Sequence, residues 1–161
     1  MKNNILKILF IGIDVSSTAN VLCALDFSGN KLLNLKALNN QPGAESILDS
    51  LLGCLDSNSF EYVVIALEST SFYSTHIANF LSSNEILLAY KPLIYSLNPK
   101  SIANYRKSFV NMDKTDPLDA YIIADFARCG RITSQHWRGF QFLALQRLIR
   151  HRLHLIECVT R

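Results

Sequence analysis

The sequence has no apolar run near the roughly 18 residues needed to cross a bilayer, and it has no C-x-x-C pair. Its four cysteines, Cys23, Cys54, Cys129 and Cys158, are far apart, which argues against a zinc site or a disulfide framework. The short apolar stretch near the start is cut off by Asp14 and lacks a small-residue cleavage site, so we interpret it as a strand rather than a signal peptide. These absences argue against a membrane partner and favour the reducing cytoplasm.

The sequence is also poor in charge, and the charges it has are unevenly spread. Charged residues make up 18% of the 161 residues and hydrophobic residues 49%, which excludes a disordered chain and gives one domain enough apolar side chains for a core. Residues 1–90 hold 4 basic and 8 acidic residues, a net charge of −4, whereas residues 91–161 hold 12 and 5, a net charge of +7. The second part is therefore the one that we expect to meet a polyanion.

The start of the chain contains three strand candidates joined by short turns. Ile8–Ile13 is a nearly continuous apolar run, as expected of a central strand covered on both faces. Ala19–Asp26 and Lys31–Leu38 follow, separated by Phe27–Asn30, whose composition is typical of a turn. This arrangement predicts an antiparallel meander.

Helical and strand patterns alternate after a loop at residues 39–43. Apolar side chains recur at helical spacing in Ala44–Leu55 and in Ser71–Ser82. Phe60–Leu67 is predicted to be a fourth strand and Ile86–Tyr90 a fifth. Three strands followed by αβαβα indicate an α/β protein with a mixed five-stranded sheet flanked by helices, which is the RNase H-like (RuvC-like) arrangement.

The rest of the chain is predicted to be loop and helix. Residues 91–115 are interpreted mostly as loop and short helix, and a helix that opens at Thr115 or Asp116 runs through Ala127. A last helix over Phe140–Val159 carries a row typical of the start of a coiled coil: Leu145, Leu148, Arg152, Leu155 and Val159. We expect one domain over residues 1–136 and the start of a coiled-coil helix over residues 137–161. Because the row has no stop signal, we expect the chain to be a fragment of a longer protein.

Two acidic residues stand directly after predicted buried strands, Asp14 after the first and Glu68 after the fourth. In a sheet of this type both strands are central and adjacent, so their ends should bring the two carboxylates together. Asp116 and Asp119 are three residues apart, which puts both on one face of the predicted helix. Gathered carboxylates repel one another unless a cation is present, and oxygen ligands suit Mg²⁺ or Mn²⁺. The sequence therefore predicts a metal site suited to phosphoryl transfer.

Each of these acids also has a simpler interpretation. Asp14 and Glu68 could be turn or cap residues where their strands end. Asp116 stands before a proline and could be the N-cap of its helix, with Asp119 as an acid of the first turn. The metal interpretation depends on the set taken together.

Two further aspartates flank this set. Asp113 lies three residues before Asp116 and would replace it as a ligand in a different register. Asp125 lies six residues after Asp119, off its helix face, and is predicted to be on the surface.

Basic residues of the second half are interleaved with tyrosines. Phosphate neutralisation by Lys and Arg, together with stacking on aromatic rings, would suit a nucleic-acid backbone. Packing of the tyrosines in the core and at its rim explains the same pattern equally well. The candidates for nucleic-acid binding are Lys91, Lys100, Arg106, Lys107 and Lys114.

Four short stretches carry a resemblance to a known family. They are IGIDVS at Ile11–Ser16, ALEST at Ala66–Thr70, NPKSI at Asn98–Ile102 and DKTDPLDA at Asp113–Ala120. In order and spacing they resemble the N-terminal domain of DEDD insertion-sequence transposases, a family that includes the bridge-RNA-guided recombinases and the pilin-segment invertase Piv. The resemblance runs from about Ile8 to the end of the chain, and KTDPLDA is its most specific motif.

The resemblance implies that the family's acidic tetrad falls on Asp14, Glu68, Asp116 and Asp119. It also implies a RuvC-like fold, dependence on Mg²⁺ (or Mn²⁺), DNA strand exchange, a homodimer or higher oligomer and, in later members of the family, a guide (bridge) RNA. The family usually has E-A-T-G around the glutamate, whereas this chain has E-S-T-S and loses the glycine. The family's C-terminal domain, which bears a nucleophilic serine, has no counterpart in these 161 residues. The chain alone is therefore expected to bind metal and nucleic acid without completing recombination.

Three alternatives stay open at this point. A stand-alone RuvC-like nuclease or Holliday-junction resolvase would use the same metals without a second domain. A sugar-kinase or actin-like ATPase fragment would explain Gly12–Thr18, which resembles a first phosphate loop, but no glycine pair follows any strand. A pure binding module would use its carboxylates as caps and its basic half to grip RNA or DNA.

Overall fold

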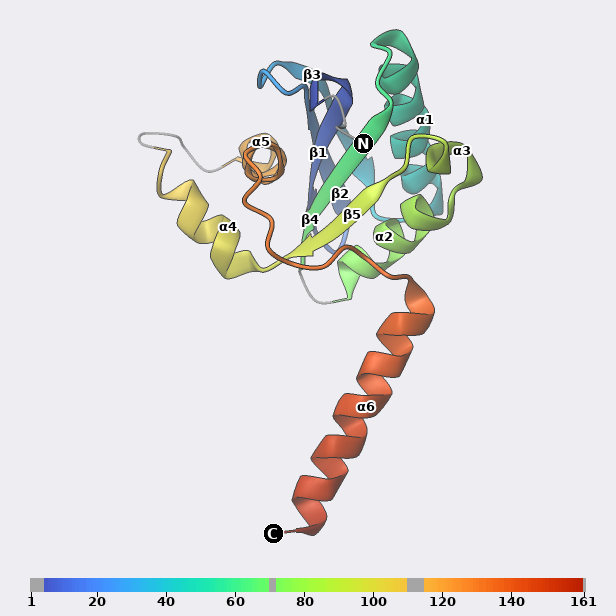
Figure 1. Cartoon of the computed structure of the whole chain (residues 1–161), viewed down its shortest axis with the longest axis vertical. Coiled ribbons are helices and arrows are strands. Elements are labelled where there is room, and N and C mark those ends of the chain that lie inside the picture. The colour runs from blue at the N-terminus through green and yellow to red at the C-terminus, as the bar shows by residue number, and fades with distance from the viewer. Residues whose placement is uncertain (1–4, 70–71, 110–114, 161) are drawn as a thin grey trace.

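One mixed five-stranded sheet organises the molecule. The structure is a computed structural model, and it describes residues 5–69, 72–109 and 115–160. Strand order in the sheet is β3-β2-β1-β4-β5 (Figure 1). β1 pairs antiparallel with β2 and parallel with β4, β2 pairs antiparallel with β3, and β4 pairs parallel with β5. The bounds of the strands are β1 (Ile8–Val15), β2 (Ala19–Leu25), β3 (Lys31–Leu38), β4 (Tyr62–Glu68) and β5 (Leu93–Leu97).

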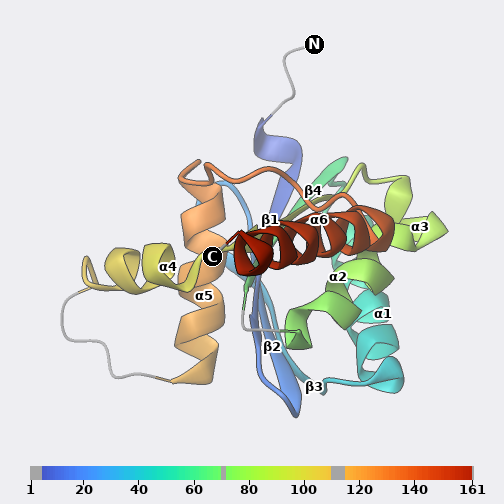
Figure 2. The ribbon, with the colours of Figure 1, turned by 90° about the horizontal axis from the view of Figure 1, so that it is seen from below.

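Helices cover both faces of this sheet. Helices α1, α2 and α3 pack on one face, and α4 and α5 lie on the other (Figure 2). Helix α6 projects away from the rest of the chain (Figure 1). None of the helices in the described residues combines the length and the hydropathy that a membrane span requires. The bounds are η1 (Ile5–Lys7), α1 (Gln41–Ser57), α2 (Tyr73–Ser83), α3 (Glu85–Leu88), α4 (Pro99–Arg106), α5 (Asp116–Arg128) and α6 (Phe140–Val159).

The alternation of side chains along β1 decides what faces each helix layer. Successive strand residues point to opposite faces of a sheet. Leu9, Ile11 and Ile13 are buried in the core cluster that contains α1 and α2. Phe10 packs in the cluster that contains α5. Asp14 shares this second face, so its carboxylate is directed to the α5 side of the sheet.

Helix α5 lies directly on β1 because Gly12 has no side chain. A Cβ atom at Gly12 would be 2.2 Å from the carbonyl oxygen of Ala120 and 2.3 Å from the backbone nitrogen of Ala124. The two alanines are fully buried against β2, together with Cys23. Burial raises the pKa of the Cys23 thiol to about 11, so this group stays neutral in the core. The small residues at these positions bring the helix close to the sheet.

The prediction of a fifth strand at Ile86–Tyr90 is wrong. Most of this segment is the short helix α3, and the fifth strand is β5, inside a region predicted to be loop and short helix. The carboxamide oxygen of Asn84 accepts hydrogen bonds from the backbone N–H groups of Ile86 (3.1 Å) and Leu87 (3.0 Å), which begins a helix. Only Leu87 of this helix is buried. A capping residue therefore outweighs the apolar composition of the segment.

Helix α1 begins earlier than predicted. The sequence predicts Ala44 as its start, whereas the helix starts at Gln41. The carboxamide oxygen of Asn40 accepts a hydrogen bond from the backbone N–H of Gly43 (3.0 Å), and Pro42 occupies the first turn. Both features are typical of a helix N-terminus, so residues interpreted as a loop belong to the first turn.

Candidate active site

The four acids predicted to form a site line one hollow at the end of the sheet. This hollow has a volume of about 450 Å³, and α4 forms its opposite wall. The residues that line it are Asp14, Glu68, Pro99, Ile102, Ala103, Arg106, Asp116 and Asp119. Side chains from β1, β4 and α5, which are far apart in the sequence, are therefore brought to one place.

The two strand acids lie at the same level of the sheet. Ile13 pairs with Leu67 in the parallel ladder between β1 and β4, and Asp14 and Glu68 are the next residue on each strand. Both acids are half-buried. Because they extend from paired strands in the middle of the sheet, the backbone positions of both are held rigidly.

The other two acids belong to the first turn of α5. Thr115 occupies the N-cap position, so Asp116 is not the N-cap of this helix. Asp116 is exposed at the rim of the hollow, whereas Asp119 is buried. The contact of α5 with Gly12 holds this turn beside the end of β1.

Two cationic side chains neutralise the α5 acids. The guanidinium of Arg106, in the last turn of α4, forms an ion pair with the Asp119 carboxylate inside the hollow. The ammonium of Lys36, on β3, lies 3.4 Å from the Asp116 carboxylate. Among the described residues, no three acidic, histidine or cysteine side chains converge closely enough to enclose one ion. In this arrangement Arg106 supplies positive charge next to the most buried of the four acids.

A buried network fixes the helix that carries Arg106. Asp125 is 5% exposed, so its prediction as a surface residue is wrong. Its carboxylate accepts hydrogen bonds from the Tyr105 hydroxyl (2.6 Å) and from Nε of Arg128 (2.9 Å). Arg128 also donates to the carbonyl oxygen of Phe27 (3.0 Å). Burial raises the pKa of Tyr105, and the hydrogen bond to Asp125 raises it further, so the phenol stays protonated. Tyr105 thereby ties α4 to α5 immediately before Arg106.

Sequence reasoning missed this network because it considered one helix at a time. Asp125 is off the face of Asp119, which led to the prediction of an exposed residue. That side of α5 is covered by α4 instead of solvent. The one sequence signal was Arg128 three residues after Asp125, a spacing at which opposite charges pair on a helix.

The predicted nucleic-acid-binding residues fall in different places. Lys100 and Lys107 are exposed at the two ends of α4, and Arg106 lies in the hollow. Lys91 precedes β5, at the opposite end of that strand from the hollow, and its ammonium lies over the ring of Tyr62 (4.8 Å to the centroid). Lys114, the alternative ligand Asp113, and the positions Thr70 and Ser71 lie outside the described residues.

Comparisons with solved structures identify the fold. RuvC from Thermus thermophilus is 17% identical, with a TM-score of 0.52 over 80% of this chain and 99% of that chain. T. thermophilus RuvC in complex with a Holliday junction substrate is 16% identical, with a TM-score of 0.51 over 81% of this chain and 99% of that chain. At such identities the likeness shows the fold alone, and it confirms the predicted RuvC-like class.

A comparison with family models identifies the family. No curated protein matches the sequence. The model of the IS110 DEDD family, described as a transposase, matches residues 11–161. The match spans nearly the whole chain and includes all four acids of the hollow. The chain therefore belongs to the IS110 family of DEDD transposases and is a RuvC-like domain of a DNA-recombining enzyme.

Proposed function

We propose that Asp14, Glu68, Asp116 and Asp119 hold a divalent metal, Mg²⁺ or Mn²⁺, with which the domain takes part in the cleavage and exchange of DNA strands. The observation that carries the proposal is the convergence of these four acids, from three separate elements, on one hollow. Membership of a transposase family supports DNA as the substrate. A solved structure of RuvC, which has the same fold, is a complex with a Holliday junction substrate, and this supports DNA as the ligand of the domain.

The chemistry of the hollow fits a hard cation. All four acidic donors are oxygen atoms, which Mg²⁺ and Mn²⁺ prefer to nitrogen and sulfur. Grouped carboxylates need positive charge nearby; without a metal, Arg106 occupies that position beside Asp119, and a bound metal would compete with it. A metal bound here would activate a nucleophile and stabilise the leaving oxygen of a phosphodiester.

The side chains of the hollow differ in how firmly they are held. Asp14 and Glu68 extend from paired strands, so their backbone positions are fixed. Asp116 is exposed and faces the open rim, where its contact with Lys36 is easily broken by a ligand. With a metal held by Asp119, the guanidinium of Arg106 would be available to contact a DNA phosphate. Lys100 and Lys107, at the two ends of α4, would contact further phosphates of the same DNA strand.

We expect Arg106→Gln to strengthen Mn²⁺ binding and to weaken the metal-free fold. The variant removes the cation that competes for Asp119, so Mn²⁺ should bind several-fold more tightly in calorimetry. Without metal, the buried carboxylate loses its charged partner, at a cost of about 1–3 kcal/mol in unfolding free energy. Lys107→Gln, the same charge change on the next residue, is the control. An Arg106→Gln protein that matches this control in both measurements would contradict the assigned role.

Binding and cleavage assays test the proposal as a whole. Calorimetry should detect Mn²⁺ binding to the chain at millimolar metal or below. Cleavage of a synthetic branched DNA should require Mg²⁺ or Mn²⁺ and stop in EDTA. A chain that binds neither metal, or that cleaves equally well in EDTA, would contradict the proposal.

A stand-alone resolvase is the second candidate function. The likeness to RuvC covers 99% of the RuvC chain, so the shared fold has no large missing part. Resolution of a four-way junction into nicked duplexes by residues 1–161 alone would favour this candidate. Metal binding without such resolution would favour a domain that works together with other parts of a transposase.

We further propose a guide RNA as a partner and the cytoplasm as the location. The net charge of +7 in residues 91–161 supports binding of a second polyanion in addition to DNA. The four free cysteines support a reducing compartment.

Helix α6 is proposed to begin a coiled coil that joins two copies of the chain. The helix buries none of its residues against the rest of the chain. Its predicted apolar row, Leu145, Leu148, Leu155 and Val159, is more than half exposed at every position. An unpartnered row of this kind gains stability by packing against another helix. We therefore propose one domain over residues 1–136 and the start of a coiled-coil helix over residues 137–161.

We expect Leu148→Glu to prevent self-association. A carboxylate in place of Leu148 would remove an apolar contact from the middle of the row and would have to lose its water in a helix pair. Sedimentation velocity should therefore show a monomer where the unmodified chain shows a dimer or larger species. His154→Glu, on another side of the same helix, should leave the association intact. Equal sedimentation of all three proteins would contradict the proposed interface.

A further inference from the structure

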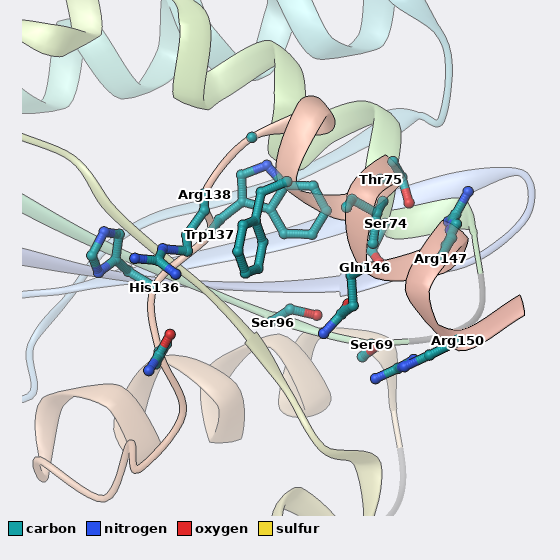
Figure 3. Close-up of a pocket in the computed structure, with 14 residues that line it drawn as sticks. Ser69, Ser74, Thr75, Ser96, His136, Trp137, Arg138, Gln146, Arg147 and Arg150 are labelled. Atoms are coloured by element: carbon teal, nitrogen blue, oxygen red, sulfur yellow. The ribbon is translucent and has the colours of Figure 1, made fainter. Parts of the chain in front are cut away.

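A second hollow opens at the same edge of the sheet as the acidic one. It has a volume of about 440 Å³, within the roughly 300–1,000 Å³ range in which proteins bind compact ligands. Its walls come from the ends of β4 and β5, the start of α2, the segment at residues 135–139 before α6, and the first turns of α6 (Figure 3). Ser69, which lines this hollow, directly follows Glu68, which lines the acidic one. The two hollows are therefore neighbours along the strand ends.

The second hollow is basic. Arg138, Arg147 and Arg150 line it, and no aspartate or glutamate does. Among the described residues none of the three arginines forms an ion pair, because the four ion pairs found there use other side chains. Arg138 lies over the ring of Phe142 (4.7 Å) and Arg147 over that of Phe72 (4.6 Å). Aromatic rings thus hold two guanidinium groups in place while their charge stays available to an anion.

The segment at residues 135–139, before α6, gives this hollow a fixed wall. The indole N–H of Trp137 donates to the side-chain oxygen of Asn79 (3.1 Å), and its backbone N–H donates to the carbonyl oxygen of Ile94 (2.6 Å). The ring is half-buried and packs against the core cluster under α1 and α2. Trp137 therefore connects the base of α6 to β5, and the arginines after it are placed relative to the sheet.

We propose that this basic pocket binds the phosphate backbone of a single-stranded DNA segment next to the strand held at the acidic hollow. Three guanidinium groups without an acidic partner among the described residues suit several phosphates, and the serine and threonine hydroxyls at the strand ends and in α2 supply hydrogen-bond donors. Trp137 and Phe142 offer flat surfaces to sugar and base. Stacking on a ring requires an unpaired base, so these surfaces favour a single strand over a duplex. The choice of DNA rests on the proposed function, because the adjoining acidic site is assigned to DNA.

Trp137 supplies an internal reporter for the test because it is the only tryptophan in the chain. The probe is a fifteen-nucleotide oligo(dT), titrated into the 161-residue chain in EDTA while the tryptophan fluorescence is recorded. We expect the DNA to quench this fluorescence. The test variant changes Arg138, Arg147 and Arg150 to Gln, and the matched control changes Lys7, Lys31 and Arg152 to Gln, which removes three charges outside the pocket. Circular dichroism checks that both variants fold.

The expected result is a weaker affinity in the test variant alone. It should bind oligo(dT) at least about tenfold more weakly than the control. The slope of its log affinity against log salt should become shallower by about 2, because each phosphate that the arginines no longer neutralise accounts for about 0.7 of that slope. Equal binding by the two variants would overturn the proposal. If the same titration gave a higher affinity for oligo(U) than for oligo(dT) of the same length, the assignment to DNA would be overturned.

The same titration separates this inference from the metal proposal. The titration is run in EDTA, so arginine-dependent quenching does not require a metal at the acidic hollow. If the chain bound no metal but kept arginine-dependent quenching, the metal proposal would fail and the pocket would stand. If the chain bound metal but its quenching did not depend on the three arginines, the pocket proposal alone would fail.

Discussion

Asp14→Asn is expected to abolish metal-dependent DNA cleavage while leaving the fold intact. Asparagine has the size of aspartate and retains an oxygen, but it lacks the negative charge that attracts a divalent cation. Asp14 extends from a central strand that pairs with β4, so the sheet fixes the position from which its carboxylate reaches the hollow. We expect both Mn²⁺ affinity and cleavage rate to fall by more than about 100-fold, the upper range for losing a residue that only orients a ligand.

Calorimetry with Mn²⁺ and single-turnover cleavage of branched DNA measure the two effects separately. Asp49→Asn, at an exposed position on α1, is the matched control and should behave as the unmodified chain. Loss of cleavage with unchanged Mn²⁺ affinity would mean that Asp14 acts on the DNA and not on the metal. Unchanged values of both would remove Asp14 from the site.

Gly12→Ala is expected to cause a large loss of stability. The added Cβ would meet the backbone of α5 at 2.2–2.9 Å. Backbone atoms of a packed helix cannot rotate away as a side-chain end can, so α5 as a whole must move off β1. The cost should be about 3 kcal/mol or more in unfolding free energy, at or above the upper range for overpacking a core.

Gly12→Ala should also weaken Mn²⁺ binding, since Asp116 and Asp119 move with α5 while Asp14 stays on β1. Gly53→Ala is the contrasting variant: Gly53 lies within α1, and an added Cβ meets nothing within 4 Å. Alanine is favoured over glycine inside a helix, so this change should stabilise the protein by about 0.5–1 kcal/mol. Urea unfolding compares the two variants. A Gly12→Ala protein as stable as Gly53→Ala would contradict the close contact of α5 with the sheet.

Where local patterns were strong, sequence reasoning identified both the elements and the acids. The continuous apolar run before Asp14 and the buried strand before Glu68 predicted two central strands that end in carboxylates. The spacing of Asp116 and Asp119 predicted one helix face. It failed at Ile86–Tyr90, where the capping side chain of Asn84 decides the structure, and at Asp125, whose surroundings come from another helix.

The sequence by itself determined the alternation of strand and helix, the order of the acids and the basic character of the second half, because each is a property of local spacing or composition. Only the tertiary structure decided that Arg106 sits among the acids and that three arginines around Trp137 share a second hollow beside them. The physical reason is that charges and cavities of this kind form between elements distant in the chain. Which side chain occupies the space next to a carboxylate depends on how closely helices pack on the sheet, and here the absence of a side chain at Gly12 sets that distance.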